Sequence, residues 1–148
     1  MRLSIIIVSH NARDLLAACL QSVCDHPPAA PFETVVVDNA SSDGSPALVR
    51  AHFPAVYLLE NERNEGFARA NNRAIQASSG EYVLLLNSDA RLRPGALDAL
   101  LDFADSHPGA ALLGPALFDP DGSPQPSILP FPTLLSETAA AFGLDRLP

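Results

Sequence analysis

Residues 4–11 read Ser-Ile-Ile-Ile-Val-Ser-His-Asn, a β-branched run that ends in three polar side chains. A strand that is apolar on both faces is typical of a parallel sheet covered by helices. Apolar residues then recur at helical spacing over residues 15–23, and a His-Pro-Pro stretch at 26–28 stops this pattern. We therefore predict a strand over residues 5–8, followed by a helix that Asn11 caps.

The same alternation of strand and helix repeats along the chain. Ser45 is expected to cap the second helix, with Pro46 in its first turn. Four strand–helix units predict an α/β fold, a Rossmann-like three-layer sandwich around a mostly parallel sheet. The further strands are expected at residues 34–37, 56–59, 82–86 and within 111–118, and the further helices at residues 45–52, 67–78 and 94–106.

The composition limits the classes of protein to which this chain of 148 residues can belong. Hydrophobic residues make up 47% and charged residues 18%, which excludes a disordered chain. The net charge is −8, and all nine basic residues are Arg. A protein that binds nucleic acid needs a basic surface, so no nucleic-acid partner is expected.

The chain divides by composition into a core and a proline-rich arm. Residues 1–122 hold the strand–helix units and end in the turn Asp119-Pro120-Asp121-Gly122. Residues 123–148 form the arm, in which only residues 134–142 have the pattern of a short helix. We predict one domain with this C-terminal extension.

Cysteine usage and hydropathy bear on the compartment. Cys19 and Cys24 lie on different faces of the first predicted helix, which predicts two free thiols and favours a reducing compartment. The apolar run after Arg2 is too short for a signal peptide, and no apolar stretch reaches the roughly 18 residues of a membrane helix. We expect a cytoplasmic protein, and peripheral association with the inner face of the membrane is left open.

Polar side chains follow each of the first four predicted strands, at the carboxyl ends where open α/β folds bind ligands. Turn chemistry alone explains most of them, including Asn39 and Asp43. It explains Asp38 and Asp89 less well, because each closely follows an apolar strand, where an ionised carboxylate needs a partner. The clusters are Ser9-His10-Asn11, Asp38-Asn39, Asn61 with Asn64, and Asn87-Ser88-Asp89.

The first turn from strand to helix argues against a dinucleotide-binding Rossmann domain. Such a domain needs a glycine-rich turn, so that its backbone can approach a pyrophosphate. Residues 9–14 read Ser-His-Asn-Ala-Arg-Asp and contain no glycine. Asp38 does stand where such a domain binds ribose, so this class is kept as a minor alternative.

Four segments resemble, in order, the sequences of family 2 glycosyltransferases with the nucleotide-diphosphosugar (GT-A) fold. They are residues 4–11; residues 35–45, Val-Val-Val-Asp-Asn-Ala-Ser-Ser-Asp-Gly-Ser; residues 64–72, Asn-Glu-Gly-Phe-Ala-Arg-Ala-Asn-Asn; and residues 80–89, Gly-Glu-Tyr-Val-Leu-Leu-Leu-Asn-Ser-Asp. Residues 119–133 are similar to the rhamnosyltransferase-like branch. The resemblance implies a GT-A core that is truncated at its acceptor-binding half.

The resemblance also implies roles for the polar clusters. Asp38 would accept a hydrogen bond from the nucleobase, and Asp89 would hold Mg²⁺ or Mn²⁺ against the diphosphate. Asn87 stands where the family has the first Asp of its D-x-D motif, so one anionic contact is lost. His10 would either stack on the base or only lead into the helix. The whole expected nucleotide-sugar site is Ser9, His10, Asn11, Asp38, Asn64, Asn71, Asn87 and Ser88, with Asp89 as the metal ligand.

The implied activity is transfer of a sugar from a UDP- or dTDP-linked donor to a saccharide or lipid-linked acceptor, in cell-envelope polysaccharide biosynthesis. Such a transfer needs a base that deprotonates the acceptor hydroxyl. No acid after Asp89 stands in the family's usual context, so we expect this chain to bind a donor and to transfer nothing. The alternative is a non-catalytic nucleotide-binding or dimerisation module with the same fold, and an open sheet edge would favour a homodimer.

Overall fold

The computed structural model describes residues 1–126 of the chain. Contacts between residues divide the chain into two units, residues 1–110 and residues 111–148. In chain order the helices and strands are β1 (Leu3–Ser9), α1 (Arg13–Asp25), β2 (Phe32–Asp38), α2 (Ser45–His52), β3 (Tyr57–Glu60), α3 (Phe67–Ala77), β4 (Tyr82–Asn87), α4 (Ala96–Ser106), β5 (Leu117–Phe118) and β6 (Pro124–Gln125).

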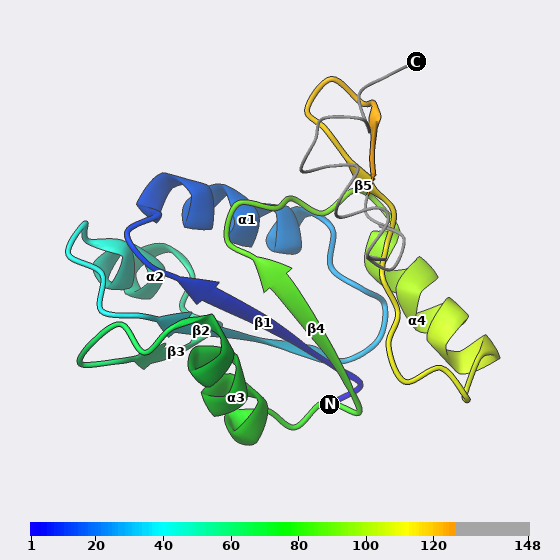
Figure 1. Ribbon diagram of the computed structural model, residues 1–148, viewed down its shortest axis with the longest axis horizontal. Coiled ribbons are helices and arrows are strands. Elements are labelled where there is room, and N and C mark those ends of the chain that lie inside the picture. The colour runs from blue at the N-terminus through cyan, green and yellow to red at the C-terminus, as the bar shows by residue number, and fades with distance from the viewer. Residues whose placement is uncertain (127–148) are drawn as a thin grey trace, which may run out of the picture. The chain divides into compact units, whose positions relative to one another are not determined.

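The first unit contains a sheet of four parallel strands in the order β3-β2-β1-β4, which confirms the predicted α/β fold (Figure 1). Ile6 of β1 pairs with Val35 of β2 on one side and with Leu85 of β4 on the other. The chain runs outward from β1 through β2 to β3 and then returns past β1 to form β4. The strand order therefore reverses between β1 and β4, and open α/β sheets bind ligands beyond the carboxyl ends of the strands at such a reversal.

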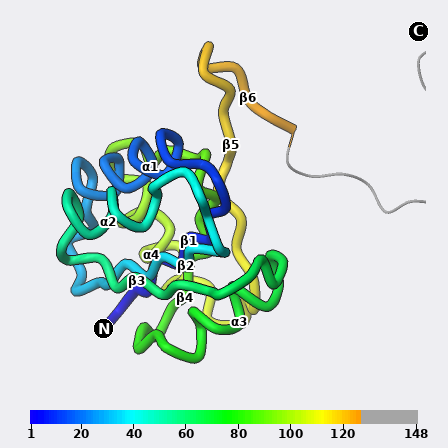
Figure 2. Tube along the Cα trace, turned by 90° about the vertical axis from the view of Figure 1, so that its left-hand side faces the viewer, coloured from blue at the N-terminus to red at the C-terminus, as the bar shows by residue number. Residues whose placement is uncertain are grey.

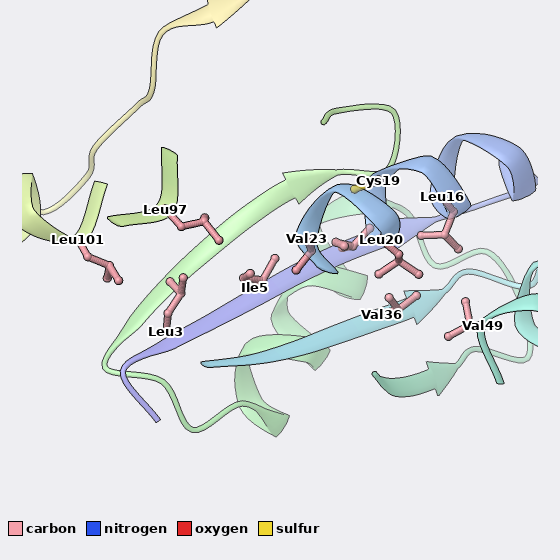
Figure 3. Packing of buried hydrophobic residues seen from close by; sticks show 11 residues of the cluster. Leu3, Ile5, Leu16, Cys19, Leu20, Val23, Val36, Val49, Leu97 and Leu101 are labelled. Atoms are coloured by element: carbon pink, nitrogen blue, oxygen red, sulfur yellow. The ribbon is translucent and has the colours of Figure 1, made fainter. Parts of the chain in front are cut away.

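Helices cover both faces of the sheet and complete the three-layer sandwich. Helices α1, α2 and α4 lie on one face, where Ile5 of β1 belongs to the same buried cluster as Leu16 and Leu20 of α1 (Figure 3). Helix α3 lies on the opposite face (Figure 2), where Ala70 and Ala74 pack against β1 and β2. Each large apolar side chain in these layers contributes about 1.5–3 kcal/mol through burial.

The strands differ in how much of each face is covered. β1 and β2 are buried on both faces along most of their length, as their β-branched runs predict. β4 alternates instead: Leu84 and Leu86 pack on the cluster shared with α1 and α4, whereas Val83 and Leu85 are 41% and 49% exposed. In the described chain β4 pairs only with β1, so it forms one edge of the sheet.

The beginnings of the first two helices differ from the prediction. Asn11 does not cap α1, which begins at Arg13 without a side-chain cap from its own N-cap residue. Asp43 supplies this cap, because its Oδ2 accepts a hydrogen bond from the Arg13 amide at 2.9 Å. Ser45 does not cap α2 either: Gly44, at φ 85°, holds that position, and Asp43 Oδ1 accepts from the Ser45 amide at 3.0 Å. One carboxylate therefore serves both helices.

The connection from α3 to β4 passes very close to the beginning of β1. The Gly80 amide donates to Ser4 Oγ at 2.8 Å, and a Cβ on this glycine would lie 2.5 Å from the Ser4 amide nitrogen. The Ser4 hydroxyl donates in turn to Glu33, which also accepts hydrogen bonds from Ser79. These hydrogen bonds hold together the amino ends of β1, β2 and β4. No larger residue fits in place of this glycine.

The described part of the second unit contains a short hairpin. β5 and β6 pair in antiparallel fashion, so the strand expected within residues 111–118 is present only as Leu117–Phe118. The turn expected at residues 119–122 is confirmed, because the Gly122 amide donates to the Asp119 carbonyl at 2.9 Å. The helix expected at residues 134–142 lies outside the described residues.

Candidate functional site

The carboxyl ends of neighbouring strands bring the predicted polar clusters to one edge of the sheet. Ser9 is the register partner of Asp38, and Asn87 is the register partner of Val8. His10 follows β1 directly, and Ser88 and Asp89 follow β4. The clusters therefore lie on both sides of the reversal in strand order between β1 and β4.

Two side-chain oxygen atoms at this edge are buried without a hydrogen-bond partner among residues 1–126. Asp38 is 3% exposed: its Oδ2 accepts from the Ser41 amide at 2.9 Å, but its Oδ1 accepts nothing. The hydroxyl of Ser9, which is 1% exposed, is the second such atom. Register partners in a parallel sheet point to the same face, so these two side chains are neighbours. Leaving a buried polar atom without a hydrogen bond costs about 1–3 kcal/mol, and more for a charged group. A ligand that donated a hydrogen bond to this atom would remove the cost.

Asn39 is buried and makes several hydrogen bonds, although its local sequence predicts an ordinary turn residue. Its Nδ2 donates to Asn64 Oδ1 at 2.8 Å, and its Oδ1 accepts from Asn61 Nδ2 at 2.9 Å and from the Glu65 amide at 3.0 Å. Its own amide donates to the Ser9 carbonyl at 2.8 Å. Asn39 thus joins the ends of β1 and β2 to the loop that precedes α3.

His10 and Asn11 are exposed and held by the loop after β2. His10 Nδ1 lies 2.8 Å from the Asn39 carbonyl, and because a carbonyl only accepts, this nitrogen carries the proton. Nε2 is then free to accept from Asn11 Nδ2, at 3.3 Å. Asn11 Oδ1 accepts from the Ser42 amide at 2.8 Å. These contacts give the ring one orientation and one tautomer. Asn11 lines an open hollow of about 430 Å³ together with residues 12–15 and Asp43.

Two asparagines of the expected nucleotide-sugar site, Asn64 and Asn71, are held by protein groups. Asn64 Oδ1 accepts from Asn39 Nδ2 and also from the Gly66 amide, at 2.9 Å. Asn71 is buried on α3, and its Nδ2 donates to the Phe67 carbonyl at 2.9 Å. Asn64 lies in the network around Asn39, whereas Asn71 is anchored within its own helix.

Asn87, Ser88 and Asp89 lead into a turn at the end of β4. The Ala90 amide donates to the Asn87 carbonyl at 3.1 Å and closes this turn, while the Asn87 and Asp89 residues are exposed. Among residues 1–126, no group of three or more His, Cys, Asp or Glu side chains is placed to hold a metal ion. A hard cation at Asp89 would therefore need further oxygen ligands from a bound diphosphate or from water.

Helix α1 contacts both ends of the segment that carries Asp89. Cys19 Sγ lies 3.5 Å from the Asn87 carbonyl, and Ser22 Oγ accepts from the Leu92 amide at 3.0 Å. Burial raises the pKa of the Cys19 thiol to about 12, and the charge of Asp89 adds to the rise. The thiol is therefore protonated at neutral pH and donates to the carbonyl.

Two further expectations concern the thiols and the membrane. Both cysteines are free, as predicted, with Cys19 buried and Cys24 exposed. Within the part of the chain that the structure describes, no helix is both long enough and apolar enough to cross a membrane.

Residues 4–133 match the family described as Glycosyl transferase family 2. The N-acetylglucosaminyl-diphospho-decaprenol L-rhamnosyltransferase of Mycobacterium tuberculosis is 38% identical over 116 residues, which cover 71% of this chain and 38% of that protein. The putative teichuronic acid biosynthesis glycosyltransferase TuaG of Bacillus subtilis is 30% identical over 139 residues, which cover 90% of this chain and 54% of that protein. The chain thus spans about half or less of the length of these relatives.

Solved structures give the same result for the fold. Residues 1–349 of S. aureus TarS, in complex with UDP-GlcNAc, match with a TM-score of 0.65 at 27% identity, over 72% of this chain and 32% of that one. The mannosyltransferase PcManGT from Pyrobaculum calidifontis, in complex with GDP-Man and Mn²⁺, matches with a TM-score of 0.65 at 30% identity, over 70% of this chain and 32% of that one. The predicted GT-A fold is confirmed.

Proposed function

The chain belongs to glycosyl transferase family 2, and from this membership we propose that it binds a nucleoside-diphosphate sugar for transfer to a saccharide or lipid-linked acceptor. The observation that carries the proposal is the buried Asp38 Oδ1, which lacks a hydrogen-bond partner in the described chain and lies at the ligand-binding edge of the sheet. The nucleotide sugars bound to TarS and to PcManGT support it. Because the chain spans 38% of the M. tuberculosis rhamnosyltransferase, the transfer itself is part of the proposal.

The free oxygen of Asp38 favours a pyrimidine base. Oδ2 already accepts from the Ser41 amide, so Oδ1 offers one buried acceptor to the ligand. Uracil and thymine present one imide N–H, whereas guanine presents two adjacent donors that match both oxygens of a carboxylate. A UDP- or dTDP-linked donor therefore fits better than a GDP-linked one. The Ser9 hydroxyl, buried beside Asp38, would add a second contact.

The ring of His10 is suited to stack on that base. Its Nδ1–H bond to the Asn39 carbonyl fixes the orientation of the ring before any ligand arrives. An aromatic face that is already oriented loses little entropy on binding. The remaining polar residues of the proposed site are Asn11, Asn64, Asn71, Asn87 and Ser88.

Asp89 is the proposed ligand of Mg²⁺ or Mn²⁺. A carboxylate beside an exposed amide suits a hard cation, and the single negative charge means that the cation is held mainly together with the diphosphate. When bound, the cation would neutralise charge on the departing nucleoside diphosphate. The protein's part is to present Asp89 beside the diphosphate after β4, while Asp38 holds the base at the end of β2, on the other side of β1.

The location and the catalytic base are part of the same proposal. Two free cysteines suit a reducing compartment, and we place the protein in the cytoplasm on that ground. The transfer requires a base that takes the proton of the acceptor hydroxyl. We predict from the sequence that none of the acidic residues after Asp89 in this chain is this base.

Calorimetry on the 148-residue chain tests the proposal. UDP- and dTDP-sugars are expected to bind in the presence of Mn²⁺, and Asp38→Asn to weaken binding at least about tenfold, because hydrogen bonds to charged groups contribute roughly 1.5–3 kcal/mol. The Asn must keep its oxygen toward the Ser41 amide, and its NH₂ group then faces the N–H of the base.

Asp102→Asn is the matched control, since it neutralises an exposed carboxylate on α4. Its affinity should equal that of the unchanged chain. Equal affinity in Asp38→Asn, or tighter binding of a GDP-sugar than of a UDP-sugar, would remove Asp38 from the base site.

A further inference from the structure

The segment that carries Asp89 is held at both ends by one face of α1. At its beginning, Cys19 Sγ lies 3.5 Å from the carbonyl oxygen of Asn87. At its end, the Leu92 amide donates to Ser22 Oγ at 3.0 Å. The exposed carboxylate of Asp89 lies between these two points, on a turn of the chain.

Both anchoring side chains are themselves fixed. Cys19 is fully buried in the cluster shown in Figure 3, and Ser22 is buried beside it. The Ser22 hydroxyl donates to the Cys19 carbonyl at 2.7 Å while it accepts from the Leu92 amide, so it is satisfied as donor and acceptor at once. Leu92 also packs its side chain against the same apolar cluster. The anchors therefore leave residues 87–92 little freedom to shift along α1.

The charge of Asp89 affects the pKa of the Cys19 thiol. It adds to the rise that burial produces in the pKa of Cys19.

We infer that Cys19 and Ser22 are positioning residues, which fix through the backbone of residues 87–92 where Asp89 meets a metal-bound diphosphate. The inference rests on the proposed function. Neither side chain is expected to touch the ligand. Their effect should appear in the affinity for nucleotide with metal and not in the affinity for nucleotide alone, because Asp38 holds the base at the end of β2.

The test measures UDP affinity by calorimetry with and without Mn²⁺, in the full chain and in three variants. In Ser22→Ala and in Cys19→Ala, the gain in affinity that Mn²⁺ provides should fall by about three- to tenfold, the effect of one lost hydrogen bond. UDP affinity without metal should stay within about twofold. Cys19→Ser keeps a donor of similar size and should restore most of the gain.

Cys24→Ala is the control, because Cys24 is exposed on the same helix. Thermal melting of each variant shows that the compared proteins are folded. An unchanged Mn²⁺-dependent gain in both alanine variants overturns the inference, and so does an equal loss of affinity with and without metal, which indicates general loosening of the fold. Absence of UDP binding by the unchanged chain under all conditions overturns the proposed function instead.

Discussion

At the scale of single residues, Asp89 carries the proposed metal chemistry. It is an exposed carboxylate on a turn after β4, next to a neutral Asn87. We expect Asp89→Ala to leave the melting temperature nearly unchanged, because no buried contact is lost, and to abolish the gain in UDP affinity that Mn²⁺ provides. Calorimetry with and without Mn²⁺ measures this directly.

Asn87→Asp is the complementary variant. A second carboxylate would give the cation one more anionic ligand, so Mn²⁺ should then raise UDP affinity several-fold more than in the unchanged chain. Mn²⁺-dependent binding that survives in Asp89→Ala would show that the cation is held elsewhere.

At residue scale the sequence predicts the surroundings of Asp38 but not those of Asp89. Both carboxylates closely follow an apolar strand and are expected to need compensation, yet only Asp38 has an oxygen, Oδ1, that is buried without a partner in the described chain, whereas Asp89 is exposed. Asn39 is not singled out, because its partners come from two distant parts of the chain: Ser9 at the end of β1, and Asn61 and Asn64 in the loop that precedes α3. No local pattern distinguishes such an asparagine from an ordinary turn residue.

At the scale of helices and strands, Asp43 links α1 to α2. Replacing it with Ala should lower the free energy of unfolding at neutral pH by about 1–3 kcal/mol, since two helix ends each lose a cap. Asp102→Asn, which changes an exposed carboxylate within α4, is the matched control and should have little effect. Urea denaturation followed by circular dichroism measures both.

The loss should depend on pH. The Ser45 hydroxyl, together with the Ser45 and Arg13 amides, lowers the pKa of Asp43 below its ordinary 3.8. A carboxyl group with a lowered pKa stabilises the fold above its unfolded pKa, and the contribution is lost as the pH falls through the folded value. The difference between the unchanged chain and Asp43→Ala should therefore be constant from pH 5 to pH 7 and shrink below 3.8. A difference that grows in acid would contradict this assignment.

The order of strands and helices was predictable because each leaves a local pattern, as β1 and β2 do in their β-branched runs. The residues at which helices begin were not predictable, since α1 takes its cap from Asp43 in the loop after β2. The strand predicted within residues 111–118 is longer than the observed β5, which has two residues. The extent of β5 depends on its pairing with β6, for which the sequence has no local pattern.

At the scale of the whole molecule, the sheet should be most stable at its centre. β1 and β2 are hydrogen-bonded on both sides and covered on both faces, whereas β3 and β4 are edge strands in the described chain. Amide hydrogen exchange should therefore be slowest in Ile5–Ile7 and Val35–Val37, and about tenfold or more faster in β3 and β4. Equal protection across all four strands would show that further contacts cover the edges.

The class of fold was predictable at this scale because four strand–helix units allow few arrangements. The strand order required the pairing of β1 with β4, which no short stretch of sequence encodes. The predicted boundary after residue 122 stays a prediction; contacts divide the chain after Ala110.

The central place of β1 has a consequence during synthesis on the ribosome. Of the four strands in this sheet β1 is made first, yet Leu3 pairs with Phe32 of β2 and with Tyr82 of β4. The chain therefore grows from β2 to the end of β4 while one edge of its most apolar strand has no neighbour. At about 5–20 residues per second this interval lasts about 3–10 s, long enough for chaperones or other nascent chains to compete for the edge that β4 later closes.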